Sequence, residues 1–421
     1  MDILSSYNLI IESSIILILS FFFSEISRKT NVPSVIMLIL LGMLCQIPLN
    51  ALGVDTSGLF PILELLGIIG LIMIVLEAAL ELKLDKKKII PITKALVIAL
   101  VGLLASAWVA ARVLMYYYPE MSTISAWLYA TPFSILSSAI IIPSVSGFRE
   151  SKKEFHVYES TFSDILGIIM FYFLTAQSET QSLSSGLLNY SGTVLLTIVI
   201  SFIASYIIVF VFQNIRSHTK LFLLIAVLML LYSLGKLMHL SSLIMILVFG
   251  LVISNIKLFF RGWLAHWLDM KKTKEIFDGL HVITIESAFV VRTFFFVVFG
   301  LTIAVESIWN LDVVIVSLLI IASIYLIRLV LLGAFIGRDI NPQLYIAPRG
   351  LITILLYYAI PVEYKFSGFN EGILLFIIMF TSLIMTGAMV ADKRKTGKAI
   401  KEAKSSPVGV QKWKAPSVDD F

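Results

Sequence analysis

The feature that most restricts this chain is a series of apolar runs, each near the length needed to cross a lipid bilayer. About 20 residues of helix span the ~30 Å hydrocarbon core, and shorter runs suffice where a helix is interrupted. Hydrophobic residues make up 59% of the 421, and thirteen runs of this kind can be marked. They cover residues 7–23, 33–47, 62–80, 90–115, 127–143, 156–176, 187–212, 221–237, 243–260, 280–305, 313–336, 344–360 and 373–390. Since the runs do not alternate as barrel strands do, the sequence predicts an all-α polytopic membrane protein with about 13 transmembrane helices.

The connections between the runs predict the orientation. Cytoplasmic connections of membrane proteins are enriched in Lys and Arg. If the N-terminus is outside, 26 of the 32 Lys and Arg residues fall in inner connections or in the C-terminal tail, and only Lys236 and Lys365 fall outside. We therefore expect an N-out, C-in protein of the cell membrane. Residues 391–421 are polar and basic, so a mobile cytoplasmic tail near anionic lipid is expected there.

Two prolines indicate an internal repeat. The fifth run contains Ala130-Thr131-Pro132, and the twelfth contains Ala347-Pro348-Arg349-Gly350. An odd number of spans separates the two units, so they would face opposite ways in the membrane. Inverted repeats with proline-interrupted spans in matching positions are typical of secondary transporters, and the interrupted spans point to the binding site. We expect two discontinuous helices that cross.

Asp164 is the most informative single residue. A carboxylate inside a membrane span costs roughly 3 kcal/mol on insertion scales, and it persists where it pairs, coordinates an ion or carries a proton. If the sixth span starts near His156, Asp164 lies about 12 Å deep at 1.5 Å per residue. Ser160 shares its helix face, and Ser163 lies on an adjacent one. These oxygens could hold a monovalent cation; the alternative is an interhelical contact with no transport role.

Arg328 lies at a depth similar to that of Asp164 and requires a counter-charge. Glu159 is the candidate partner, and pairing of these two would leave Asp164 as the one unbalanced group. The alternative is that Arg328 pairs directly with Asp164 and locks it.

Other polar groups inside the runs are secondary candidates. Glu77 either has a functional role, facing a cytoplasmic funnel or helping to anchor the moving part of the protein, or simply lies at the membrane interface. Arg349 either binds carbonyls at a helix break, which we prefer, or steers ions. Glu286 and Arg292 share a span at a spacing that places them on different faces, so each needs a partner elsewhere.

The residues at these positions resemble the monovalent cation/proton antiporter superfamily over about 390 residues. Glu159-Ser160-Thr161-Phe162-Ser163-Asp164 resembles the Glu-Ser-x-x-Asn-Asp signature of NhaP-type antiporters and animal sodium/hydrogen exchangers. Ala347-Pro348-Arg349-Gly350 resembles the Gly-Pro-Arg-Gly motif of that branch, and Arg328 falls where its eleventh-span arginine is expected. Arg28–Pro33 with Leu41–Leu44 resembles the second-span entry of the family, and Leu76–Leu82 its acidic third-span motif.

The sequence also departs from that branch. Ser163 replaces the Asn before the ion-binding Asp, and Thr131-Pro132 stands where Thr-Asp-Pro is usual. Ser137-Ser138-Ala139 is similar instead to the Ser-Ser-Thr of the potassium/proton branch, as is Asp164-Ile165-Leu166-Gly167. The choice between Na⁺, K⁺ and Li⁺ therefore stays open.

The resemblance implies an antiporter domain over residues 1–390 and a tail over 391–421. Residues 7–80 and 221–305 would form a dimerising scaffold, residues 90–176 and 313–390 the moving ion-carrying core, and residues 187–212 a linker helix. The expected function is electroneutral 1:1 exchange of a monovalent cation, Na⁺ first, for H⁺ by elevator-type alternating access. Asp164, Ser163, Ser160 and Thr131 would form the site.

Three alternatives stay open: a K⁺/H⁺ antiporter, a non-transporting membrane sensor or subunit with this fold, and a cation channel. A single buried carboxylate without a ring or filter motif disfavours the channel. No phosphate loop, metal-ligand cluster or nucleophile triad is recognisable, so we expect neither an enzyme nor a bound cofactor, and no nucleic-acid partner.

Overall fold

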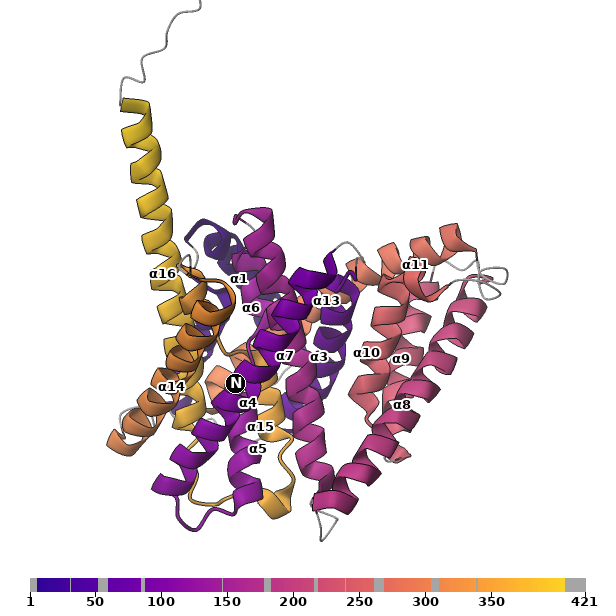
Figure 1. The fold of residues 1–421 in the computed structure, drawn as a ribbon, viewed down its shortest axis with the longest axis horizontal. Coiled ribbons are helices and arrows are strands. Elements are labelled where there is room, and N and C mark those ends of the chain that lie inside the picture. The colour runs from indigo at the N-terminus through magenta and orange to yellow at the C-terminus, as the bar shows by residue number, and fades with distance from the viewer. Residues whose placement is uncertain are drawn as a thin grey trace, which may run out of the picture.

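The computed structural model describes residues 6–30, 32–51, 60–84, 88–145, 147–177, 183–215, 219–238, 240–260, 269–303, 310–337 and 340–405. These residues are helical and contain no β-strand (Figure 1). The α-helices are α1 (Ser6–Thr30), α2 (Ser34–Ala51), α3 (Phe60–Glu81), α4 (Ile89–Tyr117), α5 (Thr123–Ser134), α6 (Ser138–Ser144), α7 (Glu150–Gln177), α8 (Leu183–Phe212), α9 (Lys220–Leu237), α10 (Ser242–Ser254), α11 (Ile256–Phe259), α13 (Met270–Thr302), α14 (Leu311–Phe335), α15 (Leu351–Tyr358) and α16 (Gly372–Ser405). Two 3₁₀ turns are η4 (Gln343–Tyr345) and η5 (Val362–Tyr364).

The expected all-α polytopic architecture is confirmed. Eight helices of the described chain are long and apolar enough to cross a membrane, taking α5 and α6 together as one unit, and three shorter apolar helices accompany them. Each apolar run marked in the sequence overlaps at least one helix. The number of thirteen crossings and the N-out orientation stay predictions.

Two of the apolar runs differ from the helices that form there: one run is interrupted, and the helix of the other extends beyond it. The run over 243–260 is interrupted at Asn255, whose side chain accepts a hydrogen bond from the Leu84 N–H (2.6 Å) and donates to the Leu82 carbonyl (2.8 Å). This contact ties the end of α3 to α10. Helix α16 continues past Val390 to Ser405, into the segment expected to be a mobile tail, because Lys, Ala and Glu there are good helix formers. Residues 406–421 lie outside the described residues.

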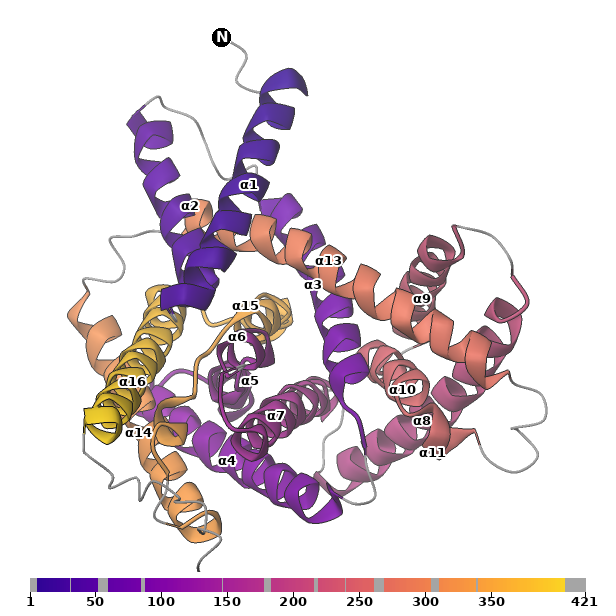
Figure 2. The same cartoon turned by 90° about the horizontal axis from the view of Figure 1, so that it is seen from above.

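The helices pack in two groups. In one, α13 packs against α2 and α3, and α10 packs against α3, α8 and α9. In the other, α4 packs against α5, α7 and α14, and α14 packs against α16. Seen from above, α5, α6, α7 and α15 lie in the middle, with α4, α14 and α16 on one side and α3 and α13 on the other (Figure 2). Helices α5 and α7 thus belong to the second group and, with α6 and α15, lie on its side toward α3 and α13.

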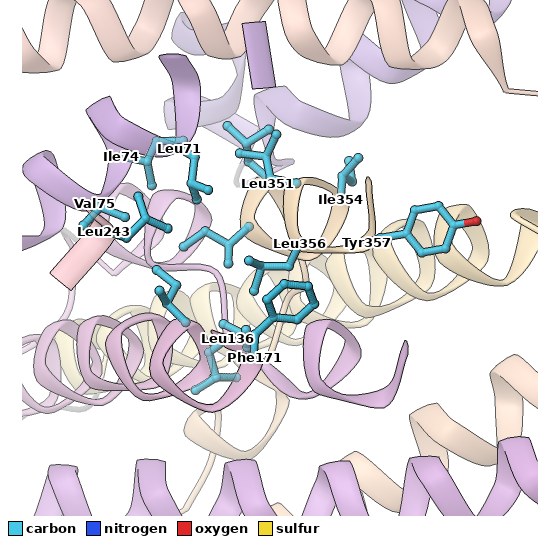
Figure 3. Packing of buried hydrophobic residues seen from close by; sticks show 14 of the residues in the cluster. Leu71, Ile74, Val75, Leu136, Phe171, Leu243, Leu351, Ile354, Leu356 and Tyr357 are labelled. Carbon is cyan, nitrogen blue, oxygen red and sulfur yellow. The ribbon is translucent and has the colours of Figure 1, made fainter. Parts of the chain in front are cut away.

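Close packing holds the first group together. A Cβ added to Gly42 of α2 would lie 2.2 Å from the Val297 carbonyl oxygen and 2.9 Å from the Gly300 Cα of α13. Only glycine permits this approach of two backbones, and small residues at such contacts are typical of membrane helix packing. Between the groups, Leu71 and Ile74 of α3 lie near Leu351 of α15 in a buried apolar cluster (Figure 3).

Candidate functional site

Two helix breaks meet in the middle of the molecule. Helix α5 ends at Ser134, and α6 begins at Ser138 after an extended segment. A second extended segment, residues 346–350, precedes α15. The Ser137 N–H donates to the Pro348 carbonyl across the two breaks (3.0 Å), so the two interrupted helices contact each other at their interruptions.

Arg349 satisfies the carbonyls that the first break frees. Its guanidinium donates to the carbonyls of Phe133 (2.6 Å), Ala347 (2.9 Å) and Ser134 (3.4 Å). The last carbonyls of a helix have no partner within the helix and carry its negative dipole end, so a buried cation stabilises them. Arg349 is 1% exposed, and its own N–H donates to the Thr381 hydroxyl (3.1 Å). Of the two interpretations of Arg349, these contacts favour binding to freed carbonyls.

Asp164 lies beside these breaks, within α7. Its side chain is 2% exposed, and neither carboxylate oxygen accepts a hydrogen bond from a residue in the described ranges. The hydroxyl and N–H of Ser138, at the start of α6, face it. Ser138 therefore offers its two donors only at long range, and no cation pairs with the carboxylate within the described ranges. A buried carboxylate in this situation is costly in a membrane, so the arrangement is suited to a group that a cation or a proton occupies.

Glu159 lies one turn earlier on α7 and is fully paired. The Arg328 guanidinium of α14 donates to both of its carboxylate oxygens (2.6 and 2.9 Å). The Nε of Arg328 donates to the Gln343 carbonyl (3.2 Å), so the arginine is held away from Asp164. The structure thus brings Glu159 and Arg328 together, and it does not contain the alternative pair of Arg328 with Asp164.

His156 belongs to the same cluster, and sequence reasoning missed it. The side chain is buried, and its Nδ1 lies 3.3 Å from a Glu159 oxygen. The i, i+3 spacing of His156 and Glu159 on one helix was the available signal.

The predicted hydroxyl ligands are buried and bonded to backbone. Ser160 donates to the His156 carbonyl (2.7 Å), and Thr131 donates to the Trp127 carbonyl (2.7 Å). Ser163 accepts from the Leu136 N–H in the first break (3.0 Å), which fixes the position of the break against α7. Within the described ranges, no hydrogen bond joins Ser160, Ser163 or Thr131 to Asp164.

A cavity of about 340 Å³ leads toward Asp164 from one side. Serines of α1 and α2 line it, as do Glu77 and Glu81 of α3, and it ends at α6, where Ser138 faces Asp164. Within the cavity wall, Arg292 of α13 donates to both oxygens of Glu77 (3.3 and 3.4 Å). This pair supplies the partner that Arg292 was expected to need, whereas Glu286 on the same helix is exposed.

Aromatic side chains fill the space on the α5 side of the break. The Phe369 ring lies 4.4 Å from that of Tyr129 and 5.7 Å from that of Tyr357, measured between centroids. Phe133 stacks on Phe369 as well. The cavity that contains Glu77 and Glu81 therefore lies on the α6 side of the break, away from this aromatic cluster.

Comparison with known proteins gives three results. Residues 15–397 match the model of the sodium/hydrogen exchanger transmembrane family. A structure of the sodium proton antiporter MjNhaP1 from Methanocaldococcus jannaschii at pH 8 superposes with a TM-score of 0.67 at 19% identity, covering 90% of this chain and 94% of that one. An electron-microscopy structure of the same antiporter gives 0.63 at 19% identity, covering 98% and 100%. No curated protein sequence matches this chain.

Proposed function

The chain belongs to the sodium/hydrogen exchanger family, and from that premise we propose that it exchanges a monovalent cation, Na⁺ first, for H⁺ across a membrane, with Asp164 as the shared site. The family is one of transporters, and several apolar helices make this a multi-pass membrane protein of the plasma membrane. One observation carries the proposal: the Asp164 carboxylate is buried beside the two crossing breaks. Neither of its oxygens accepts a hydrogen bond from the described residues.

The proposed mechanism is competition for one pair of oxygens. Burial disfavours the charged form of a carboxylate. A bound proton or cation neutralises that charge and removes the cost. The Asp164 oxygens, with the hydroxyls and carbonyls near the breaks, are ligands of the kind that coupling ions find in broken-helix transporters. Because the empty, charged site is costly to move through the membrane and the occupied site is not, only occupied forms cross.

The stoichiometry follows from the charges around the site. Arg328 balances Glu159 through two hydrogen bonds, which leaves Asp164 as the exchangeable charge in this cluster. One carboxylate that holds either Na⁺ or H⁺ exchanges them one for one. We therefore propose an electroneutral cycle.

Alternating access would move one helix group against the other. The cavity lies between α1, α2, α3 and α13 on one side and α6, which packs against α7, on the other. We propose that residues 90–176 and 313–390 shift as an elevator against a scaffold of residues 7–80 and 221–305. Residues 187–212 would link the two, and the scaffold would form a homodimer.

Two competing functions can be distinguished by one flux assay, which is described in the next paragraph. A K⁺/H⁺ antiporter is the nearer one, since Ser138, in the stretch similar to the potassium/proton branch, faces Asp164. A non-transporting sensor would have the same site and no flux.

The test measures proton movement in proteoliposomes with a pH-sensitive dye. The purified protein is given NaCl, KCl or LiCl in turn across a pH series. We expect Na⁺-dependent proton movement that Asp164→Asn abolishes while the variant keeps its unfolding temperature. Glu363→Gln, which removes an exposed acid outside the site, is the matched control and should retain exchange. Retained exchange in Asp164→Asn would refute the site; a response to K⁺ alone would assign the potassium function.

A further inference from the structure

A second cavity, of about 430 Å³, lies where the start of α4, the start of α7 and the end of α14 meet near η4. We propose that it binds the headgroup of an anionic phospholipid that carries free hydroxyl groups, such as phosphatidylglycerol. The cavity is separate from the one that leads toward Asp164, and the two share no lining residue. It lies at the end of the molecule that the charge pattern predicts to be cytoplasmic.

The charge of the cavity wall favours an anion. Lys94 of α4 and Lys152 of α7 line the cavity together with Ser151, and no acidic residue in the described ranges does; the Lys152 ammonium also donates to the Asn341 carbonyl (3.5 Å). The nearest acids along α7 are already paired, since Glu154 contacts Lys88 and Glu150 contacts Lys153. Lysines near a membrane surface attract anionic lipid.

An unpartnered buried amide indicates what the headgroup carries besides a negative charge. Gln343 lines the cavity and is 3% exposed. Its side-chain oxygen accepts no hydrogen bond from the part of the chain that the structure describes. A buried acceptor left without a donor costs free energy, and a hydroxyl of a glycerol headgroup would supply the donor.

The outer rim of the cavity fits a lipid better than a soluble phosphate. Ile90 is 70% exposed, and Pro91 and Phe335 on the same rim are exposed as well. Exposed apolar side chains continue from there along both helices, including Trp108 on α4 and Val330 on α14. Acyl chains could lie along these faces while the headgroup occupies the cavity.

The lipid cavity is connected to the candidate ion site by hydrogen bonds that pass through Arg328. The Gln343 carbonyl accepts from Arg328, which pairs with Glu159. A lipid in this cavity would therefore contact α7, the helix that carries Asp164. Binding itself does not depend on the proposed function, whereas any effect of the lipid on exchange does.

Native mass spectrometry of the purified full chain in detergent tests the proposal. Phosphatidylglycerol and phosphatidylcholine with identical acyl chains are titrated separately. We expect a preference for phosphatidylglycerol that falls about thirtyfold in Lys94→Gln/Lys152→Gln, because each lysine near an anionic surface contributes about 1 kcal/mol. Lys153→Gln/Lys274→Gln removes the same charge outside the cavity and should leave the preference unchanged.

Two further measurements test the role of the headgroup hydroxyl and distinguish a membrane lipid from a soluble phosphate. Gln343→Leu should weaken phosphatidylglycerol more than doubly ionised phosphatidic acid at pH 9, which lacks the glycerol hydroxyls of phosphatidylglycerol. Soluble glycerol phosphate at millimolar concentration should not displace the lipid. Equal binding of phosphatidylglycerol and phosphatidylcholine, an equal loss in both lysine pairs, or full displacement by glycerol phosphate would overturn the proposal.

Discussion

Two carboxylates on α7 show how residue environment assigns different roles to similar groups. Glu159 is bound by Arg328 through two hydrogen bonds and lies beside His156. Asp164 is equally buried, yet accepts no hydrogen bond from the described residues. The first carboxylate is thus held by charge pairing, and under the proposed function the second is satisfied by the cation or proton that it binds.

Removing the arginine alone should be more damaging than removing the whole pair. Arg328→Gln leaves Glu159 buried without its cation, and breaking a buried ion pair in this way costs about 3–5 kcal/mol. We expect a large fall in the unfolding temperature in detergent, and a partial recovery in Glu159→Gln/Arg328→Gln because no uncompensated charge is left. A double variant with the summed loss of the two single variants would show that the two side chains are not coupled.

The pairing of Glu159 with Arg328 and the burial of Asp164 could be predicted from depth and charge balance in a membrane, whereas the role of Asp164 as the ion site stays a prediction. The sequence could not select Glu77 as the partner of Arg292, since several acids lie inside apolar runs and only the packing of α3 on α13 distinguishes them. The sequence also could not predict the hydrogen bonds of Ser163 and Arg349 to the backbone at the break between α5 and α6. These bonds depend on backbone positions that no side-chain pattern specifies.

At the scale of elements, the central feature is the contact between the two helix breaks. Pro132 and Pro348 predicted interruptions in the right two segments. Helix α5 nevertheless continues through Pro132 to Ser134. Proline removes one backbone donor, but it does not decide where the next turns end. The break lies where Arg349, Ser163 and the Pro348 carbonyl supply partners for the freed groups.

A methyl group placed at this contact should separate the breaks. A Cβ on Gly350 would lie 2.3 Å from the Ser137 hydroxyl oxygen and 2.9 Å from the Ser137 Cβ. We expect Gly350→Ala to lower the rate of cation-dependent proton movement at least tenfold, by analogy with the about 100-fold loss that a 1 Å misplacement can cause at a reacting site. Gly333→Ala on α14, where no atom lies within 4 Å of the added Cβ, should behave as the parent. Equal rates in the two variants would show that the crossing geometry does not set turnover.

At the scale of the whole molecule, the group that contains α2, α3 and α13 faces the group that contains α4, α5 and α7, with α6 between the cavity and the second group. The sequence predicted a polytopic helical membrane protein correctly, since apolar runs of the right length leave few other folds. The grouping of helices far apart in the chain came from the resemblance, because hydropathy carries no information on which helices pack together. The assignment of a moving and a fixed group remains a proposal.

An electroneutral cycle has a consequence for the whole molecule. Moving one elementary charge through 100 mV changes the free energy by about 2.3 kcal/mol, so a cycle with no net charge should not respond to voltage. We expect the same Na⁺-driven proton flux in vesicles held at zero and at 100 mV by a potassium gradient with valinomycin. A clear change would indicate a second titrating group. Glu77→Gln would then be examined first, because Glu77 lines the approach to Asp164.

Proton release on cation binding tests the shared site most directly. The detergent-purified protein is mixed with NaCl in a weakly buffered solution at a pH where the site is protonated, and the protons released are counted against the Na⁺ bound. Competition at Asp164 predicts about one proton released per Na⁺ bound, an apparent Na⁺ dissociation constant that rises about tenfold per unit of falling pH, and neither effect in Asp164→Asn. Na⁺ binding without proton release, or unchanged release in the variant, would contradict the account.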